Sequence, residues 1–317
     1  MPLEPDVQKR LQDLRNEPVR NLSDMDAKEI RRIMNEGITT KFREKVKYVK
    51  DFEFSHHENN ITARLYIPEN ASDSLILYFH GGGYVYGNIE THDEVCRMAA
   101  NYSGSRVLSV NYRLAPEHKF PAQLEDAIES LLWVQNNSEL LGINPQKIAV
   151  AGDSSGGNLA AGLCLKARDQ NMKLPMLQVL LYPFVMVLDP SESMREYSEG
   201  YARSQYPNMG RFLVESELND LSEILNPYFS VFMHDNLSGL PETVIVTAEF
   251  DSLRDQAETY LAELRKAGVK ATGIRGIGMA HGFANYAHEV RAGQNIMVMI
   301  WSLVGDILNE RTTQAVP

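Results

Sequence analysis

Alternating apolar and polar positions predict a β-hairpin early in the chain. Every second residue of the run 61–67 (ITARLYI) is apolar, while Thr62 and Tyr66 lie on the opposite face. A period of two is typical of a strand with one buried face. The run 46–54 (VKYVKDFEF) alternates in the same way, and residues 58–60 (ENN) between the two runs supply turn chemistry.

The first forty residues carry the spacing of one-sided helices. Val7, Leu11 and Leu14 recur at positions i, i+4 and i+7. Ser23 is the expected N-cap of a second helix. The apolar stripe of that second helix consists of Ile30, Ile33 and Met34. Neither helix can bury its stripe alone, so both must pack on another part of the protein.

From residue 75 onward, short and almost continuously apolar runs alternate with helical patterns. Such runs are typical of parallel strands that are covered on both faces. One intervening helix is predicted over 121–134, with Pro121 at its N1 position. The strand-like runs are 75–79, 106–110, 147–151, 176–182, 243–248 and, less regular, 269–274. This alternation predicts an α/β protein with a mainly parallel sheet between two layers of helices.

The alternation stops between Pro183 and Pro241. This stretch carries helical patterning at 210–225 and several turn signals, but no convincing buried strand. We therefore expect an insertion, residues 185–238, that packs over the sheet together with the N-terminal residues 1–45. The rest of the chain then forms the core of the domain, in two parts, 46–184 and 239–317.

The composition is that of one globular domain. The chain has 317 residues, of which 44% are hydrophobic and 23% charged, and this is enough apolar matter to bury a sizeable core. The net charge of −11 disfavours nucleic acid and anionic membrane surfaces, because both require Lys and Arg grouped on one face. We expect neither nucleic acid nor a membrane among the partners.

The cysteines and the start of the chain predict a cytoplasmic protein. Cys96 and Cys164 lie in apolar helical patterns without metal-type spacing, so we expect reduced core residues and no metal site. Residues 1–18 are charged throughout and lack the apolar region of a secretory signal. No run approaches the roughly 18 uninterrupted apolar residues that a membrane helix needs, so no stable membrane insertion is expected.

The strongest chemical motif is AGDSSGGN at 151–158. It contains Gly-x-Ser-x-Gly as Gly152, Ser154 and Gly156, directly after an apolar strand-like run and directly before a helical one. A nucleophile elbow requires this context, because small neighbours must let the chain pass a sharp turn. The N-terminus of the following helix also favours negative charge that develops beside the serine. Ser154 is the predicted nucleophile.

A serine hydroxyl is a weak nucleophile and needs a base within hydrogen-bond reach. After a nucleophile elbow the partners follow in the order Ser, Asp or Glu, His. Three histidines lie downstream, His234, His281 and His288. His281 lies in the Gly-rich loop GMAHGF before the C-terminal helical pattern, whereas His234 falls in the insertion and His288 in the predicted helix. His281 is the predicted base.

The acid that orients the base should lie just beyond a strand end. Glu249, Asp251 and Asp255 follow the strand-like run 243–248. Asp251 is the first carboxylate in the loop after the strand proper. Asp255 is expected at the start of the next helix, where an acidic residue complements the helix dipole. We predict Asp251 as the acid and keep Asp255 as the alternative.

Acyl transfer also needs donors that face the oxyanion of the tetrahedral intermediate. The run 80–88 (HGGGYVYGN) follows a predicted strand, and its glycines let the backbone approach a substrate closely. In hydrolases with a nucleophile elbow, this loop supplies one donor and the residue after the nucleophile supplies another. The predicted oxyanion donors are Gly82, Gly83 and Ser155.

Five sequence blocks together resemble the hormone-sensitive-lipase-like esterases of the α/β-hydrolase superfamily. They are HGGGYVYGN, NYRLAPEHKFPAQLEDA at 111–127, GDSSGGN, EFDSLRD and HGF, in this order. The opening MPLEPDVQKRL is also similar to bacterial members. The resemblance implies an eight-stranded, mostly parallel sheet with an antiparallel second strand, and a helical cap built from the N-terminus and the insertion. It further implies hydrolysis of small esters with short to medium acyl chains, without a cofactor.

Carried over residue by residue, the resemblance implies the same site. Ser154 would be the nucleophile, Asp251 and His281 its partners, and the amides of Gly82, Gly83 and Ser155 the oxyanion donors. His80 would organise its loop. The run 269–274 would be the sheet edge of a homodimer. The chain departs from the family pattern in two places, at Ser155, where Ala is usual, and at Ser252, where Pro is usual.

Two other functions use the same fold. An amidase or deacetylase that acts on N-acyl substrates has the same three catalytic side chains, so the sequence leaves it open. A non-catalytic small-molecule receptor of this family has lost the catalytic histidine. Because His281 is present, the receptor is disfavoured.

Overall fold

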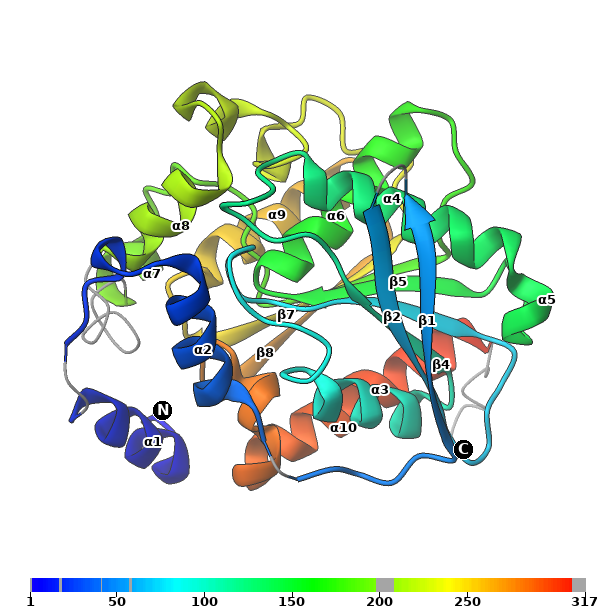
Figure 1. Cartoon of the computed structure of the whole chain (residues 1–317), viewed down its shortest axis with the longest axis horizontal. Coiled ribbons are helices and arrows are strands. Elements are labelled where there is room, and N and C mark those ends of the chain that lie inside the picture. Colours follow the sequence, from blue (N-terminus) through cyan, green and yellow to red (C-terminus); the bar gives the residue numbers. More distant parts are fainter. Residues whose placement is uncertain (1, 17–18, 41, 57–58, 198–207, 310–317) are drawn as a thin grey trace.

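One eight-stranded β-sheet runs through the molecule (Figure 1). The computed structural model describes residues 2–16, 19–40, 42–56, 59–197 and 208–309. The strand order is β1-β2-β4-β3-β5-β6-β7-β8. β2 is antiparallel to both of its neighbours, and every other pairing is parallel. The strands are β1 Tyr48–His56, β2 Asn59–Ile67, β3 Leu75–Phe79, β4 Arg106–Asn111, β5 Ile148–Asp153, β6 Leu177–Leu181, β7 Glu242–Phe250 and β8 Ala271–Ala280. The predicted α/β class and the antiparallel second strand are confirmed.

Two hydrophobic cores cover the two faces of this sheet. On β3, Leu77 and Phe79 belong to one core, whereas Ile76 and Tyr78 belong to the other, because side chains alternate along a strand. The first core contains α4 (Ala122–Asn136), α6 (Ser155–Asp169) and α9 (Arg254–Lys266), and the second contains α3 (Asp93–Ser103), α10 (Arg291–Leu308) and the 3₁₀ segment η4 (Phe283–Glu289). The short helix α5 (Ser138–Leu141) follows α4. Pro121 is the N-cap of α4 and not its N1 residue.

The hairpin of β1 and β2 is confirmed, with two corrections. His56 pairs with Asn59 and Ser55 with Asn60, so the expected turn residues Asn59 and Asn60 belong to β2. Glu58, the third expected turn residue, lies outside the described residues. Tyr66 is fully buried, although the alternation placed it on the polar face. Helix α3 contacts β2 and covers this second face, so Tyr66 packs in the second core.

The N-terminal helices form as expected, but with a different cap. They are α1 (Pro5–Arg15) and α2 (Ala27–Ile38), separated by a 3₁₀ turn η1 (Leu22–Asp24). Ser23 lies inside that 3₁₀ turn and is not the N-cap of α2. Asp26 is the N-cap, because its side chain accepts a hydrogen bond from the N–H of Glu29 at 2.8 Å.

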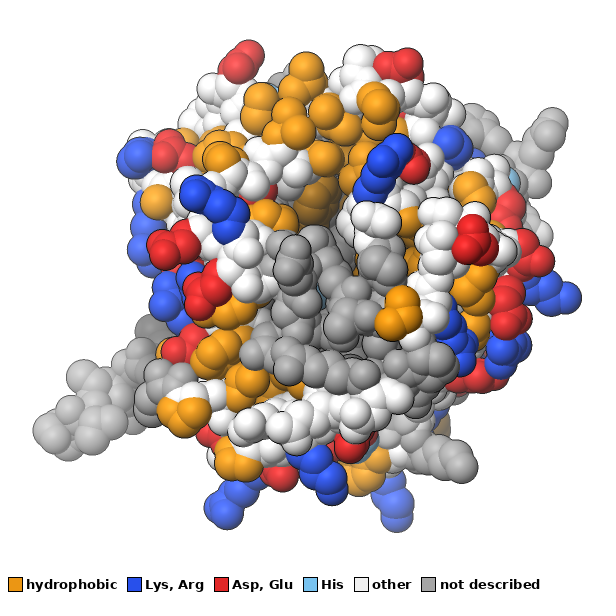
Figure 2. Space-filling model, turned by 90° about the vertical axis from the view of Figure 1, so that its left-hand side faces the viewer, with side chains coloured by type: hydrophobic (Ala, Val, Ile, Leu, Met, Phe, Trp, Pro, Cys, Tyr) orange, Lys and Arg blue, Asp and Glu red, His pale blue; other side chains and the backbone are white. Residues whose placement is uncertain are grey.

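The described part of the insertion is helical. It contains α7 (Glu192–Tyr197), α8 (Met209–Glu217) and the 3₁₀ turns η2 (Leu221–Leu225) and η3 (Val231–Met233). The face of the molecule that bears α2, α7 and α8 shows hydrophobic side chains gathered on its upper part, with charged side chains toward its rim (Figure 2). Within the described ranges, no helix is long and apolar enough to cross a bilayer.

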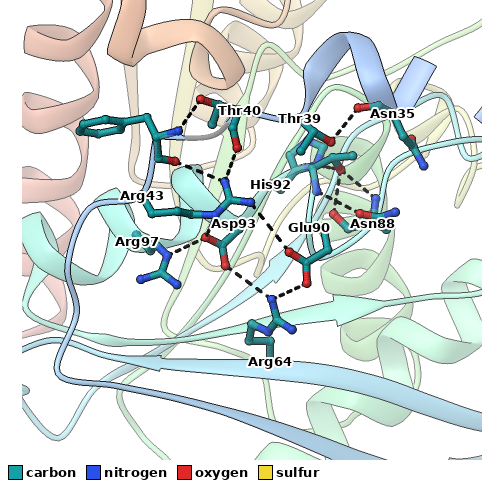
Figure 3. Close-up of polar contacts among 12 residues, drawn as sticks. Asn35, Thr39, Thr40, Arg43, Arg64, Asn88, Glu90, His92, Asp93 and Arg97 are labelled. Atoms are coloured by element: carbon teal, nitrogen blue, oxygen red, sulfur yellow. Dashed lines mark hydrogen bonds and ion pairs between the residues drawn. The ribbon is translucent and has the colours of Figure 1, made fainter. Parts of the chain in front are cut away.

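Three arginines from three segments converge on the buried carboxylate of Asp93 (Figure 3). Arg97 lies one turn further along α3, Arg64 lies on β2, and Arg43 lies between α2 and β1. Their guanidinium nitrogens are 2.6, 3.6 and 2.7 Å, respectively, from a carboxylate oxygen of Asp93. Tyr66 also donates to this carboxylate at 2.9 Å. A buried carboxylate needs such partners, because its desolvation is costly. Asp93 thereby ties the connection before β1 to the core.

The neighbouring Glu94 is a buried carboxyl with fewer partners. Its Oε2 accepts the N–H of Glu44 at 2.8 Å. The pKa of Glu94 is raised to about 7, mainly by burial and further by the negative charges of Glu44 and Asp93. The hydrogen bond from the N–H of Glu44 and the positive charge of Arg97 oppose this rise in pKa. Glu94 is therefore protonated in the folded protein at pH values where it is ionised in the unfolded chain.

Glu94 should make the protein less stable as the pH rises from about 4.5 to about 7. In this window the folded state holds a proton that the unfolded state has lost, so each rise in pH favours unfolding. We expect Glu94→Gln to remove this part of the pH dependence. Urea unfolding of the wild type and the variant at pH 5 and pH 8 measures the change in the free energy of unfolding between the two pH values. Glu69→Gln is the control, because Glu69 is exposed. A wild-type pH profile in Glu94→Gln would contradict the assignment.

Candidate active site

Ser154 occupies the sharp turn between β5 and α6. Its backbone has φ 54° and ψ −118°. A positive φ is uncommon for a residue with a side chain and costs on the order of 1–3 kcal/mol. The turn is held because the N–H of Ser154 donates to the carbonyl of Leu181 at 2.9 Å and its carbonyl accepts the N–H of Asn158 at 3.1 Å. The predicted strand, elbow and helix are all present.

Two glycines allow this elbow (residues 152–156) to pack against β3. A Cβ on Gly152 would overlap the carbonyl of Gly156, and a Cβ on Gly156 would overlap the carbonyl of Phe79. Backbone oxygens cannot move aside as a flexible side chain can. The spacing Gly-x-Ser-x-Gly is therefore required by contact with the neighbouring strand.

His281 and Asp251 reach Ser154 from the ends of β8 and β7. His281 Nε2 lies 3.0 Å from Ser154 Oγ, and His281 Nδ1 lies 2.8 Å from Asp251 Oδ2. The other carboxylate oxygen, Oδ1, accepts the N–H of Leu253 at 2.9 Å. The Asp251 side chain is fully buried, while that of His281 is 42% exposed. The three residues therefore form a hydrogen-bonded chain from the buried Asp251 through the partly exposed imidazole of His281 to the hydroxyl of Ser154.

Of the two candidate acids, Asp251 contacts the imidazole of His281, whereas Asp255 is bonded to other residues. Asp255 lies in the first turn of α9, where its Oδ2 accepts the N–H of Ser193 and its Oδ1 accepts from Arg254, both at 2.8 Å. These bonds join α7 to α9 and direct the carboxylate away from the imidazole. The other two histidines are also engaged elsewhere, His234 with Asp169 and His288 with Thr40, both at 2.9 Å. His288 lies in η4 and not in the C-terminal helix.

Tyr182 supports the imidazole and was not singled out from the sequence. It directly follows β6 and has a positive φ of 36°. Its ring meets the ring of His281 edge-on, with 5.1 Å between the centroids. This contact limits the positions open to the imidazole. Nothing in the local sequence marks Tyr182, because the contact depends on β6 and the loop after β8 meeting in space.

The loop of residues 80–88, here called the oxyanion loop, bends at two glycines. Gly82 has φ 124° and Gly83 has φ 57°. The carbonyl of Gly82 accepts hydrogen bonds from the N–H groups of Val85 and Tyr86, each at 3.1 Å. A Cβ on Gly82 would overlap the carbonyl of Tyr86. The tight bend therefore requires glycine at position 82, a constraint that the motif by itself did not indicate.

His80 stabilises this loop and carries no charge. Burial and, to a smaller extent, the nearby His92 lower the pKa of His80 to about 3. Its Nδ1 lies 2.8 Å from the carbonyl of Gly81, and its ring stacks on that of Tyr112 at 4.3 Å. Tyr112 also donates its hydroxyl to the carbonyl of His80 at 2.6 Å.

Asp153 joins the elbow to the oxyanion loop beneath the nucleophile. Its Oδ1 accepts the N–H of Gly81 at 2.9 Å and the hydroxyl of Tyr78 at 2.8 Å, and His92 Nε2 lies 3.2 Å away. Burial acts to raise the pKa of Asp153, but His92 and these two hydrogen bonds together lower it below its usual value. Asp153 lies inside the GDSSG motif, but the motif alone does not indicate these contacts, because Tyr78, Gly81 and His92 come from other parts of the chain.

Helices α2 and α8 hold the other end of the oxyanion loop. Arg31 Nε donates to the carbonyl of Val85 at 2.8 Å, and the side chain of Asn35 accepts the N–H of Gly87 at 2.9 Å. The side chain of Leu213 on α8 lies where a Cβ on Gly83 would be. Val85, Ile30 and Met209 share a small hydrophobic core. The N-terminal helix and the insertion therefore meet at this loop.

The aromatic residues of the insertion do not form one group. Phe229 is 3% exposed and packs against Tyr84, Phe120 and Phe184. Tyr228 donates its hydroxyl to Asp169 at the end of α6. Both residues fasten the insertion to the core, while Tyr206 lies outside the described residues. Phe212 packs in the core shared by α2 and the oxyanion loop.

The described residues offer no set of metal ligands. Over these parts of the chain, no three His, Cys, Asp or Glu side chains are grouped so that they could hold an ion. Cys96 and Cys164 are free thiols inside the two cores. Burial raises the pKa of both thiols, so they are poor metal ligands and poor nucleophiles.

Residues 76–285 match a family model described as the alpha/beta hydrolase fold. An arylesterase from Saccharolobus solfataricus is 35% identical over 309 residues, which cover 97% of this chain and 99% of the relative. The carboxylesterase NlhH from Mycobacterium tuberculosis is 37% identical over 242 residues, 74% of each chain. An ethyl acetate hydrolase from Pseudomonas putida is 32% identical over 247 residues, 76% of this chain and 77% of the relative.

Solved structures match over nearly the whole chain. A structure of an arylesterase has a TM-score of 0.89 at 35% identity, covering 97% of this chain and all of the other. A hyperthermophilic esterase from the archaeon Pyrobaculum calidifontis has a TM-score of 0.87 at 36% identity, covering 99% of this chain and all of the other. The likeness therefore includes the N-terminal helices and the insertion as well as the sheet.

Proposed function

This chain belongs to the hormone-sensitive-lipase-like branch of the alpha/beta hydrolase family, and we propose that it hydrolyses short- to medium-chain carboxylic esters through an acyl-enzyme formed on Ser154. The enzyme is a carboxylesterase. One observation carries the mechanism, namely the hydrogen-bonded chain from Ser154 through His281 to the buried Asp251.

In the proposed reaction, Ser154 Oγ attacks the ester carbonyl while His281 Nε2 takes its proton. Asp251 holds the proton on Nδ1, so that Nε2 is free to accept, and stabilises the imidazolium that forms. The imidazolium then protonates the leaving alcohol. Water attacks the acyl-enzyme by the same steps and releases the acid. The buried carboxylate and the partly exposed imidazole suit these two roles.

The negative charge of the tetrahedral intermediate would be bound by backbone amides. We assign this role to Gly82 and Gly83 of the oxyanion loop and to Ser155. Ser155 is the first residue of α6, and the first N–H groups of a helix have no partner within it. The positive end of the α6 dipole adds to the stabilisation.

We also propose that residues 1–45 and 185–238 form a cap over this site, around a core of 46–184 and 239–317. The contacts of α2 and α8 with the oxyanion loop support this division. A cap that touches the oxyanion loop can shape the space for the acyl group and exclude water from it.

Ser154→Ala should lower kcat for p-nitrophenyl butyrate by about 10⁴-fold or more, because the nucleophile is lost. Asp251→Asn should cost about 10⁴-fold, because an amide stabilises the wrong imidazole tautomer. The matched variant Asp255→Asn should keep most of the activity, since Asp255 bonds to Ser193 and Arg254. Initial rates and far-UV circular dichroism would be compared for the three variants. Wild-type turnover by Ser154→Ala would overturn the mechanism.

The preferred length of the substrate's acyl chain distinguishes an esterase from a lipase. We expect kcat/KM for p-nitrophenyl esters to peak with short to medium acyl chains and to fall steeply by C12. The relative named ethyl acetate hydrolase supports the short end of this range. A rate series from C2 to C12 measures it. A profile that stays flat or rises out to C12 would contradict the proposed substrate class.

We propose a homodimer formed by the edges of two sheets, with β8 as the contact strand. β8 is the last strand in the order of the sheet, and an edge strand offers unpaired backbone groups for pairing. Sedimentation equilibrium should give twice the chain mass of 35.8 kDa. A sedimentation mass equal to one chain would remove this proposal. The cytoplasmic location inferred from the sequence stays a prediction.

A further inference from the structure

Two hydrogen bonds to side chains, one on each side of Gly82 and Gly83, join the oxyanion loop to the elbow and to the first turn of α6. Before the glycines, the N–H of Gly81 donates to Asp153 Oδ1 at 2.9 Å. After them, the hydroxyl of Tyr84 donates to Asn158 Oδ1 at 2.5 Å. Asp153 precedes the nucleophile, and the Asn158 N–H donates to the Ser154 carbonyl in the first turn of α6. The two bonds therefore bracket the glycines and the nucleophile together.

Asn158 can hold Tyr84 in only one way. Its side chain is 1% exposed, and its Nδ2 donates to the carbonyls of Phe184 at 3.0 Å and Phe229 at 2.8 Å. Because two carbonyls face the amide nitrogen, the amide oxygen must face Tyr84 and act as an acceptor. One amide thereby connects α6, the oxyanion loop, the segment after β6 and the insertion.

Tyr84 is the matching donor. Its side chain is 5% exposed, and its backbone has a positive φ of 63°. Burial raises the pKa of Tyr84 well above its usual value, so the hydroxyl keeps its proton. Rings of Phe229 and Tyr112 pack beside it at 6.0 and 6.4 Å. The strained backbone is thus anchored by a buried side chain that has one polar partner.

We propose that Tyr84 and Asn158 are positioning residues for the oxyanion, a role that rests on the proposed function. The donors assigned to the oxyanion lie on two separate segments, Gly82 and Gly83 on the loop and Ser155 on α6. The Tyr84–Asn158 hydrogen bond spans these two segments and sets the distance between them. Donors stabilise a transition state only when they are preorganised around the developing charge, and displacement by about 1 Å can cost up to about 10²-fold in rate.

This role has a kinetic signature that a purely structural role lacks. Donors for the oxyanion act on the tetrahedral intermediate and little on the ground-state ester. Loss of the hydrogen bond should therefore lower kcat while KM stays nearly constant. It should also weaken binding of a trifluoromethyl ketone, whose adduct with Ser154 carries the same oxyanion, by the same factor as kcat/KM.

The test compares Tyr84→Phe with Tyr66→Phe in the full-length protein. Both variants remove one buried tyrosine hydroxyl from a carboxyl or amide acceptor, but Tyr66 donates to Asp93, outside the proposed site. With p-nitrophenyl butyrate, we expect Tyr84→Phe to lower kcat on the order of tenfold and to raise the inhibition constant of the ketone equally. Tyr66→Phe should keep wild-type kcat and inhibition, even if its melting temperature falls.

A double-variant cycle shows whether the two residues act through one bond. In an Asn158→Ala background, Tyr84→Phe should cause no further loss of kcat or of ketone binding. The proposal is overturned if Tyr84→Phe alone keeps wild-type kcat and ketone binding, or if Tyr84→Phe raises KM instead of lowering kcat. It is also overturned if the fold-losses of kcat in the two single variants multiply in the double variant. These outcomes differ from failure of the proposed function, in which the wild type would not cleave the ester or Ser154→Ala would still do so.

Discussion

The backbone conformation of Ser154 is the constraint on which the rest of the structure depends. A residue with a side chain adopts a positive φ only when its surroundings hold it there. Here the N–H of Ser154 donates to the carbonyl of Leu181 on β6, and the carbonyl of Phe79 on β3 lies directly against Gly156. The turn places Ser154 beyond the end of β5, and α6 begins at the next residue. Strained geometry and helix dipole thus come from one local feature.

Everything else at the site is placed relative to this turn. β7 and β8 end beside it and deliver Asp251 and His281, because the carboxyl ends of parallel strands lie at the same edge of a sheet. β3 delivers the oxyanion loop to the same edge. Asp153 in the elbow and Asn158 in the first turn of α6 then accept hydrogen bonds from that loop. The oxyanion loop and His281 are therefore both hydrogen-bonded to the elbow or to the first turn of α6.

The N-terminal helices and the insertion add a layer that the sheet alone does not explain. Arg31 and Asn35 bind the backbone of the oxyanion loop, and Leu213 packs on its glycines. The charge cluster at Asp93 fastens the connection between α2 and β1 to the core. Helices α2 and α8 are therefore in direct contact with the oxyanion loop.

The sequence by itself determined the class of sheet and the elbow, because both depend on short-range patterns of apolar residues and glycine. It also predicted His281 as the base, because the other downstream histidines lie in the insertion and in a helical pattern. Other features were decided only by the tertiary structure. Asp251 meets His281 across 30 residues and Tyr84 meets Asn158 across 74, and no local pattern contains such distances. Tyr66 was misplaced for the same reason, since a period of two shows that a strand has two faces but not that α3 covers the second.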